Sequence, residues 1–432
     1  MMFEKYDAYQ RSTNSILPLY PLHWTIKKIK HVAKVYNGDS LSNEKKDTFS
    51  SVDLSSRPYI SSKDISVEDS SINYNSGLSI PNNLREYKVA PTNSTLICIE
   101  GGSAGRKVAF TELEVSFVNK LACLYSKSEV NKFIFYTLKS EPFKTQFKLA
   151  MSGFIGGVAI SDIENFSIFL PPITEQKTIV SFLDKKVNEI DHLIRIEENK
   201  IKLLKEHIRI TINKAVIKGL NPEVEFKNSK IDWVGEIPKH WEVLRFKNLF
   251  DQSNLSVRDS DEVVTSYRDG QVTLRSNRRV GGYTEAILEQ GYQGVRKGQL
   301  VLNSMDAFEG AIGVSDSDGK CTPEYVVCNP KSDGISQYYF AYLLREMALA
   351  KYIQVICSAV RQRAVRIRFN NLAKQEFIVP PKEEQEAIVK FIESEIEKLN
   401  SLISELNKKI ISLKEYKTTL INDAVTGKIK VA

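Results

Sequence analysis

The residues best able to do chemistry in this sequence are glycines and cationic side chains that share loops. Residues 100–107 read Glu-Gly-Gly-Ser-Ala-Gly-Arg-Lys and directly follow a predicted strand. The glycines would let backbone amides approach an anion closely, and Arg106 and Lys107 would supply positive charge. Residues 152–157 form a second glycine-containing stretch, just before a long helical pattern. A plain surface turn is the alternative interpretation of the first loop.

Arginine is concentrated in the second half of the chain, where Arg361 and Arg363 lie within residues 358–363. This stretch occupies the position that residues 152–157 hold in the first half, and residues 303–306 correspond by order to the first loop. Arginine suits phosphate and guanine edges, whereas asparagine and glutamine suit adenine. So dense a group of arginines favours contact with a polyanion over a solvated face.

Sequence signatures of catalysis are missing. Leu170 and Val379 precede the two Pro-Pro pairs, where an amino-methyltransferase motif would have Asn or Asp. No P-loop occurs, and the glycine pairs do not follow the dinucleotide fingerprint. The five histidines and five cysteines show no metal-ligand spacing. We therefore expect no catalytic residue, no metal site and no cofactor on this chain.

The composition fits a globular protein of two or more domains, since 432 residues are too many for one ordinary core. A net charge of +7 permits a polyanionic partner but is too mild to require one. The N-terminal residues lack the apolar core of a signal peptide, and no apolar run approaches the roughly 20 residues of a membrane span. Cysteines in an odd number without CxxC pairs are typical of a reducing compartment. We expect a soluble, cytoplasmic protein.

A long internal repeat organises the chain. Leu170-Pro171-Pro172 matches Val379-Pro380-Pro381 at an offset of 209 residues, and Glu175-Gln176 matches Glu384-Gln385 at the same offset. Upstream, Pro21-Leu22-His23-Trp24 matches Pro238-Lys239-His240-Trp241 at an offset of 217. The segment before Trp24 thus corresponds to the segment that follows the first repeated helix, so the duplication is circular. Such a chain closes on itself with pseudo-twofold symmetry and brings its two ends near each other.

After each Pro-Pro pair comes a pattern of about five heptads, which indicates a coiled-coil seam. The seam positions are Leu183, Val187, Ile190, Ile194, Glu197, Ile201, Leu204, Ile208 and Ala215 in the first copy, and Ile392, Ile396, Leu399, Ile403, Leu406, Ile410, Leu413, Lys417, Leu420 and Ala424 in the second. Gly219 and Gly427 mark the ends of helices of about 40 residues, or about 60 Å. Because each helix is alone in its half, we expect the two to pair antiparallel. Two independent helices are the alternative.

Glu197 and Lys417 interrupt the seams, and the corresponding positions of the other copy hold Leu406 and Ile208. We expect these two opposite charges to face each other and to fix the register of the helix pair. The alternative is that both lie at the margin of the coil and extend into solvent.

The stretches between the repeats combine short β-like runs, such as residues 95–99 and 299–302, with helical patches at residues 129–139 and 336–349. They correspond in outline but share little sequence. The predicted fold is therefore α/β, of the α+β type, with two globular regions joined by two long helices that form an antiparallel coiled coil. From the N-terminus, we expect a first globular region over 1–159, a first helix over 160–219, a second globular region over 220–368, and a second helix over 369–432.

This arrangement resembles the specificity subunit of type I restriction-modification enzymes. The resemblance depends on the paired P-x-HW segments, the paired LPP-x-x-EQ segments, and the sequence Ala-Val-Thr-Gly-Lys-Ile at residues 424–429. The order and duplication of these motifs cover essentially the whole chain. The first copy departs from the last motif at residues 215–220, which alters a helix end and no chemistry.

The resemblance implies a non-catalytic subunit that binds double-stranded DNA. Each globular region would be a target-recognition domain that reads one half of a bipartite site, while the helices set the spacing and dock adenine methyltransferase and motor-nuclease subunits. S-adenosylmethionine, ATP and Mg would bind to those partner subunits. The residues expected to contact DNA are Gly101, Gly102, Ser103, Arg106, Lys107, Gly153, Phe154, Arg275, Arg278, Arg279, Asn303, Asp306, Arg361, Gln362, Arg363 and Arg366. The alternatives are a specificity subunit of a system without a motor subunit, a chain with its own enzymatic activity, and a coiled-coil adaptor that binds no DNA.

Overall fold

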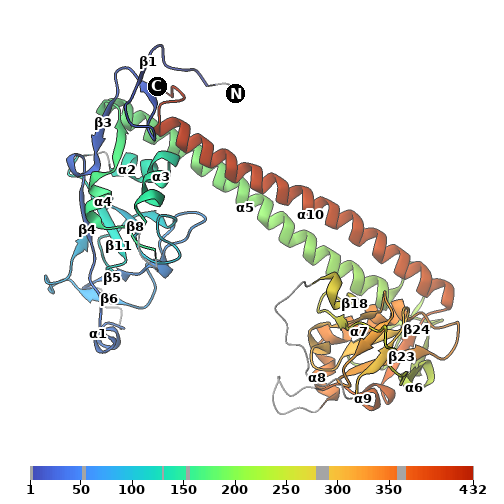
Figure 1. The fold of residues 1–432 in the computed structure, drawn as a ribbon. Helices are drawn as coiled ribbons and strands as arrows, with labels where there is room; N and C mark the ends of the chain where they lie inside the picture. The colour runs from blue at the N-terminus through green and yellow to red at the C-terminus, as the bar shows by residue number, and fades with distance from the viewer. Residues whose placement is uncertain are drawn as a thin grey trace. The chain divides into compact units, whose positions relative to one another are not determined.

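Two long helices and two compact units make up the chain (Figure 1). The computed structural model describes residues 3–50, 55–128, 131–151, 156–278, 291–357 and 366–431. Unit 1 comprises residues 1–199 and 406–432, and unit 2 comprises residues 200–405. Each unit therefore contains part of both long helices, because the division falls within helix α5 (Ile173–Lys218) and helix α10 (Lys382–Val425).

Unit 1 is built on two four-stranded sheets. The first is antiparallel, with the order β4 (Lys34–Asn37), β11 (Leu121–Tyr125), β8 (Thr95–Cys98) and β9 (Val108–Phe110). The second has the order β6 (Ser79–Pro81), β5 (Ser56–Ile60), β10 (Val115–Phe117) and β7 (Val89–Ala90), in which β5 and β10 run parallel. Helix α2 (Asn131–Leu138) packs on β8, β9 and β11, and is followed by α3 (Glu141–Ala150) and α4 (Ile160–Asn165). A short helix, α1 (Asn43–Thr48), follows β4.

Unit 2 contains an antiparallel sheet with the order β16 (Phe250–Gln252), β23 (Tyr325–Pro330), β20 (Leu300–Asn303) and β21 (Ile312–Val314). Two strand pairs accompany it, β17 (Val264–Ser266) with β18 (Val272–Leu274), and β19 (Gln293–Val295) with β22 (Gly319–Cys321). Helix α7 (Gln337–Leu349) packs on β20 and β21. The shorter helices are α6 (Phe246–Leu249), α8 (Tyr352–Ile356) and α9 (Phe369–Ala373).

The two units repeat a common frame. A hairpin of β1 (Tyr9–Arg11) and β2 (Leu19–Pro21) in unit 1 corresponds to a hairpin of β13 (Phe226–Asn228) and β14 (Glu236–Pro238) in unit 2. Likewise, β3 (Thr25–Lys28) pairs with β12 (Ser167–Leu170), as β15 (Glu242–Arg245) pairs with β24 (Glu376–Val379). Tyr9 faces Pro21 and Phe226 faces Pro238, so the hairpin registers follow the sequence offset of 217. The predicted duplication is confirmed in structure.

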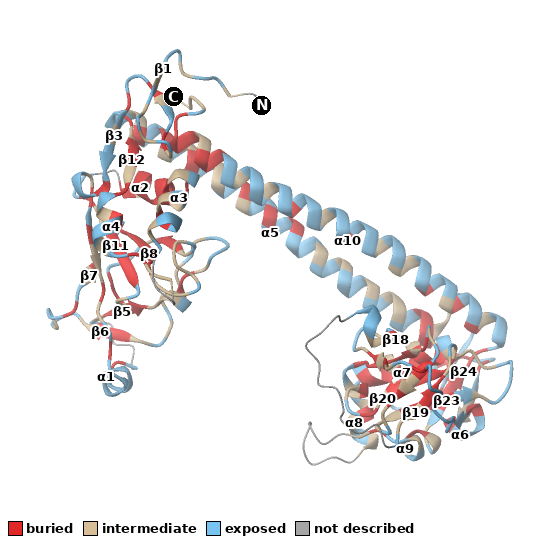
Figure 2. Cartoon of the chain, viewed as in Figure 1, coloured by how far each residue is buried: buried red, intermediate tan, exposed pale blue. Residues whose placement is uncertain are grey.

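Helices α5 and α10 contain 46 and 44 residues, slightly longer than the predicted 40. Every predicted seam position is buried or half-buried, as the burial pattern along both helices shows (Figure 2). Asp191 and Glu197 on α5 pair with Lys417 and Lys409 on α10, so the numbers ascend on one helix as they descend on the other. The two helices are therefore antiparallel, as predicted. No helix of the described residues is long and apolar enough to cross a membrane.

The two ends of the chain meet within unit 1. The backbone amide of Lys430 donates to the carbonyl of Glu4 at 2.8 Å, and the two residues form an isolated β-bridge. This contact confirms the closure that the circular repeat predicted.

Candidate nucleic-acid interface

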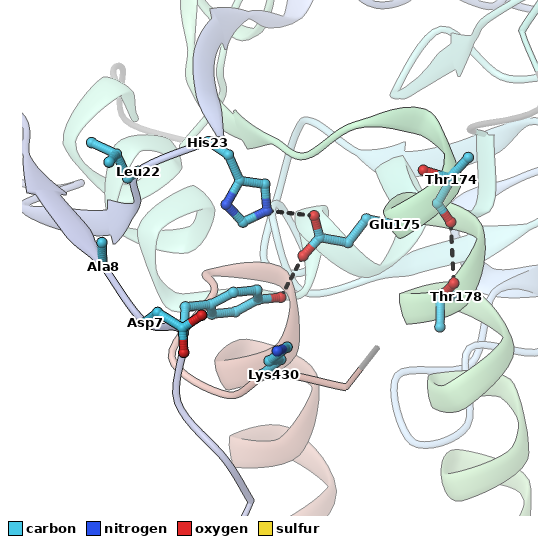
Figure 3. Close-up of a pocket in the computed structure, with 9 residues that line it drawn as sticks. Asp7, Ala8, Leu22, His23, Thr174, Glu175, Thr178 and Lys430 are labelled. Carbon is cyan, nitrogen blue, oxygen red and sulfur yellow. Dashed lines mark hydrogen bonds and ion pairs between the residues drawn. The ribbon is translucent and has the colours of Figure 1, made fainter.

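A glutamate at the start of each long helix joins the two repeated motifs. In unit 1, the carboxylate of Glu175 accepts hydrogen bonds from the Trp24 indole at 3.1 Å and from the Tyr6 hydroxyl at 2.6 Å. It also lies 2.8 Å from Nε2 of His23 (Figure 3). Trp24 is only 2% exposed. Burial first, and then the hydrogen bond to Glu175, raise the pKa of the Tyr6 hydroxyl far above its ordinary value. We call this cluster of Tyr6, His23, Trp24 and Glu175 the first node.

The second copy forms the same arrangement in unit 2. The carboxylate of Glu384 accepts a hydrogen bond from the Trp241 indole at 2.9 Å and lies 2.6 Å from Nε2 of His240. We call His240, Trp241 and Glu384 the second node. The following glutamines also act alike, because the side-chain amides of Gln176 and Gln385 donate to the carbonyls of Pro171 and Pro380 at 2.7 and 2.8 Å. The P-x-HW and LPP-x-x-EQ motifs are therefore the two parts of one packing unit.

The far end of the opposite long helix closes each node. Gly427, just after α10, has φ +72°, and a Cβ there would lie 2.4 Å from Pro21 and 3.2 Å from the Trp24 ring. Gly219, just after α5, has φ +74°, and a Cβ there would lie 3.1 Å from the Trp241 ring. Only glycine fits this backbone conformation so close to an indole. The helix ends that were predicted from Gly219 and Gly427 are thus confirmed.

Each node borders a cavity. The cavity of the first node, about 530 Å³, is lined by Asp7, His23, Thr174, Glu175 and Lys430, among others (Figure 3). The cavity of the second node, about 300 Å³, is lined by residues that include Asn221, His240 and Glu384. The two units therefore carry equivalent recesses at equivalent positions of the repeat.

The predicted glycine loop of unit 1 follows β8 and forms hydrogen bonds within itself and with Ser62. Gly101 and Gly105 have φ of +84° and +71°, which glycine tolerates and other residues rarely adopt. Arg106 is exposed, and its guanidinium donates to the carbonyl of Gly102 at 2.9 Å. The Lys107 ammonium instead donates to the carbonyl of Ser62 at 2.5 Å, so Lys107 supports the loop. The backbone amide of Arg106 donates a hydrogen bond to the carbonyl of Ser103.

Three of the predicted arginines of unit 2, Arg275, Arg278 and Arg366, lie in the described residues and contact neighbouring side chains. The Arg278 guanidinium lies 2.8 Å from Asp269 and 4.1 Å from the centre of the Tyr267 ring, and Nε of Arg366 lies 3.6 Å from Glu324. Arg275 donates to the Thr265 hydroxyl at 3.3 Å.

The predicted polar residues Asn303 and Asp306 flank a turn after β20. The backbone amide of Asp306 donates to the carbonyl of Asn303, and the Asp306 carboxylate accepts a hydrogen bond from Arg268 at 3.0 Å. Asp306 is thus a carboxylate that neutralises a nearby guanidinium. The predicted residues Gly153, Phe154, Arg279, Arg361, Gln362 and Arg363 lie outside the described residues.

The predicted pairing of Glu197 with Lys417 is wrong. Glu197 is only 2% exposed and lies 2.8 Å from Lys409, while Lys417 lies 2.6 Å from Asp191. Lys417 therefore meets a residue six positions before Glu197, and Glu197 meets a residue eight positions before Lys417. The register differs from the expected one by about one heptad. Both charges are nevertheless satisfied across the helix pair, and the expectation that they would extend into solvent is not met either.

Sequence reasoning missed a group of cationic side chains beside the glycine loop. A cavity of about 720 Å³ in unit 1 is lined by the loop, by α3 and by the last part of α10. The cationic residues in its lining are Arg106, Lys139, Lys144, Lys148 and Lys417. They come from segments far apart in the sequence, so no local pattern could have grouped them.

Within the described residues, no group of three or more His, Cys, Asp and Glu side chains is arranged to hold a metal ion. The five cysteines are free thiols, four of them buried. The described residues instead provide cationic side chains, the backbone amides of the glycine loop and two equivalent recesses. These groups suit the binding of a partner.

Comparison with known proteins gives a consistent family. The chain is similar to the type I restriction enzyme MjaVIII specificity subunit of Methanocaldococcus jannaschii, with 25% identity over 78% of this chain and 80% of the relative. It is also similar to the putative type I restriction enzyme MjaX specificity subunit of the same organism, with 22% identity over 95% of each chain.

Solved structures share the fold. A chain from a structure of a type I R-M system aligns with a TM-score of 0.68 at 14% identity, over 94% of this chain and 98% of that one. The HsdS subunit from Thermoanaerobacter tengcongensis aligns with a TM-score of 0.52 at 16% identity, over 95% and 98%. The family model described as the type I restriction modification DNA specificity domain matches residues 21–206 and 238–412. The chain therefore belongs to the family of type I restriction-modification specificity subunits.

Proposed function

We propose that this chain reads a bipartite DNA site and carries the subunits that modify and cleave DNA. The globular regions within residues 1–159 and 220–368 each recognise one half of the site. The helices within residues 160–219 and 369–432 set the spacing and dock two adenine methyltransferase subunits and the motor-nuclease subunits. The chain itself is non-catalytic, and S-adenosylmethionine, ATP and Mg bind to the partners.

The observation that supports this proposal best is one frame repeated with different loops. The two nodes, with Glu175 and Glu384 at their centres, share the histidine and tryptophan contacts and open onto equivalent recesses. Equivalent recesses suit two copies of one partner, because two surfaces of similar shape and chemistry bind the same partner surface. By contrast, the loop of residues 100–107 is rich in glycine, whereas residues 303–306 carry an aspartate that binds Arg268. Divergent loops on a shared frame suit the reading of two different half-sites.

Methylation mapping tests the proposal directly. The chain is co-expressed with an adenine methyltransferase subunit of a type I system, and N6-methyladenine is mapped along the host DNA. We expect methylation at one motif of two short halves separated by a fixed number of unspecified bases. Replacing residues 246–375, between β15 and β24, with the same region of another family member should change one half and leave the other unchanged.

Three outcomes would contradict the proposal. Methyl transfer by the purified chain alone would make it an enzyme. A motif that changes in both halves after the exchange would refute one region for each half. If neither the chain nor its complex showed salt-dependent DNA binding, the remaining interpretation would be a coiled-coil adaptor that binds no DNA.

A further inference from the structure

The cationic cavity of unit 1 has the size and lining of a ligand site. Its volume, about 720 Å³, lies within the range of small-molecule pockets, about 300–1,000 Å³. Apolar side chains, including Val108, Leu138, Phe147 and Ile421, contribute to its lining together with the five cationic residues. Glu68 is the one carboxylate among the described lining residues. A pocket that is apolar and strongly cationic suits an anion with a flat or apolar body.

The cations of this cavity are less neutralised than the described arginines Arg278 and Arg366 of unit 2, which pair with Asp269 and Glu324. Lys417 pairs with Asp191 and Lys144 pairs with Glu141, each through one carboxylate. Lys139 lies 4.5 Å from the centre of the Phe135 ring. Neither Lys139 nor Lys148 forms an ion pair with a carboxylate of the described residues.

Lys139 and Lys417 also repel each other. Burial first, and then the positive charge of Lys417, lower the pKa of the Lys139 ammonium to about 8, although Asp191 and Asp69 act in the opposite direction. Two ammonium groups close enough to repel form a site where an anion would stabilise both. The glycine loop leaves open space for an anion, because a Cβ added at Gly102 would meet no atom within 4 Å.

We propose that this cavity binds a nucleoside phosphate, with the phosphate at Lys139, Lys148 and Lys417 and the base against the apolar lining near Phe147. The ligand is either a nucleotide unit of a DNA strand or a free nucleotide. In its DNA form the inference rests on the proposed function, since the glycine loop that would read DNA is one wall of the cavity. In its free form it is an effector site beside that loop.

A matched pair of variants and one loop substitution test the cavity in the full chain. Lys148→Glu reverses an exposed charge of the lining, and Lys27→Glu reverses an exposed charge on β3 that does not line it. Gly102→Asp adds a carboxylate at the loop. The probes are a fluorescein-labelled 30-base-pair duplex and a ribose-labelled fluorescent ATP, each followed by fluorescence anisotropy.

We expect Lys148→Glu and Gly102→Asp to weaken the binding of at least one probe about tenfold, because each variant places a carboxylate beside the phosphate of the probe. Lys27→Glu should stay within about twofold. Weakening of the duplex alone assigns the site to DNA, and weakening of ATP alone assigns it to an effector. Equal effects of Lys148→Glu and Lys27→Glu, or no binding of either probe to the wild type, would overturn the proposal. Binding of ATP but not of DNA would uphold the cavity and contradict the proposed function.

The pH dependence gives a readout that a structural role would not produce. The groups facing Lys139 are Lys417 of α10, Asp191 of α5, Lys144 of α3 and Asp69. Because Lys139 loses its proton as the pH rises through about 8, the affinity for the probe should fall between pH 7 and pH 9. Lys139→Met should bind more weakly at pH 7 and lose this dependence on pH. An unchanged pH profile in Lys139→Met would remove Lys139 from the site.

Discussion

Substitution of Glu175 by alanine tests whether the first node holds the N-terminal hairpin in place. Glu175 lies in the first turn of α5, and its carboxylate accepts hydrogen bonds from Trp24 and Tyr6. The Trp24 indole is buried, so without Glu175 its N–H would lose its acceptor away from solvent. Glu384→Ala is the matched variant of the second node, where the carboxylate side chain is 41% exposed against 11% for Glu175.

The expected costs follow from these contacts. Hydrogen bonds to a charged group contribute about 1.5–3 kcal/mol each, and Glu175 accepts two of them, from the buried Trp24 indole and the half-buried Tyr6 hydroxyl. At the lower bound, Glu175→Ala should destabilise the hairpin by about 3 kcal/mol, with little added by His23, whose side chain is 49% exposed. In the second node, only the Trp241 indole is shielded and water can reach Glu384. Glu384→Ala should therefore cost about 1–1.5 kcal/mol.

Hydrogen exchange of the two hairpins measures these costs as local opening. A loss of about 3 kcal/mol should speed exchange of residues 9–21 about 150-fold in Glu175→Ala, and exchange of residues 226–238 about tenfold in Glu384→Ala. Thr174→Ala, an exposed change in the same turn of α5, is the control and should leave both hairpins unchanged. Equal acceleration by Glu175→Ala and Glu384→Ala would refute the role assigned to burial. Acceleration of residues 226–238 by Glu175→Ala would refute the independence of the two nodes.

Three further predictions concern stability and reactivity. Gly427→Ala should destabilise unit 1 by about 3 kcal/mol, because it combines a left-handed backbone with a clash against Pro21, whereas Gly235→Ala, at φ +75° with open space around it, should cost about 1 kcal/mol. The lowering of Tm measures both costs, and equal shifts in the two variants would contradict the clash. Glu197→Leu should be neutral or stabilise by up to about 2 kcal/mol, since Leu406 occupies the corresponding position of the second copy, and a clear loss of Tm would show that the charge is needed. Burial raises the pKa of the Cys123 and Cys321 thiols to about 11 and about 12, so few of these thiols are thiolates at pH 8. A disulfide reagent should therefore label the half-buried Cys357 first, and rapid labelling of Cys321 in the native protein would contradict this.

Much of the fold could be predicted because the strongest signals are periodic or repeated. The heptad seams identified both long helices, and the paired motifs identified the frame of each unit. The register of the helix pair could not be predicted, because a seam that repeats every seven residues fits equally well when shifted by seven. The seam alone does not show how far one helix is shifted along the other. Contacts at the helix ends set this shift, with Gly427 against Trp24 and Gly219 against Trp241, and these contacts form only in the folded protein.

The candidate site was predicted less completely, for a physical reason. Arg278 and Asp269 are nine residues apart, but Arg366 and Glu324 are far apart in the sequence and meet only in the folded unit. A cluster of arginines therefore indicates charge without showing how much of it is neutralised. The cavity lysines illustrate the converse, because Lys139 and Lys417 become one electropositive site only when α10 packs beside α3.

The ion pairs of unit 2 do not conflict with a role in DNA binding. Exposed pairs such as Arg268 with Asp306, where the arginine side chain is 62% exposed, are screened by water and stabilise the fold little. A phosphate or a guanine edge that offers a bidentate contact of about 1–3 kcal/mol could displace such a carboxylate. Under the proposed function, unit 2 would thus bind by exchanging partners, and the displaced carboxylates would penalise any site that offers no better acceptor. Unit 1, where Lys139 and Lys148 beside the glycine loop form no ion pair with a carboxylate of the described residues, would bind mainly by attraction. The two half-sites would then contribute differently, with affinity and its salt dependence coming mainly from unit 1 and discrimination mainly from unit 2.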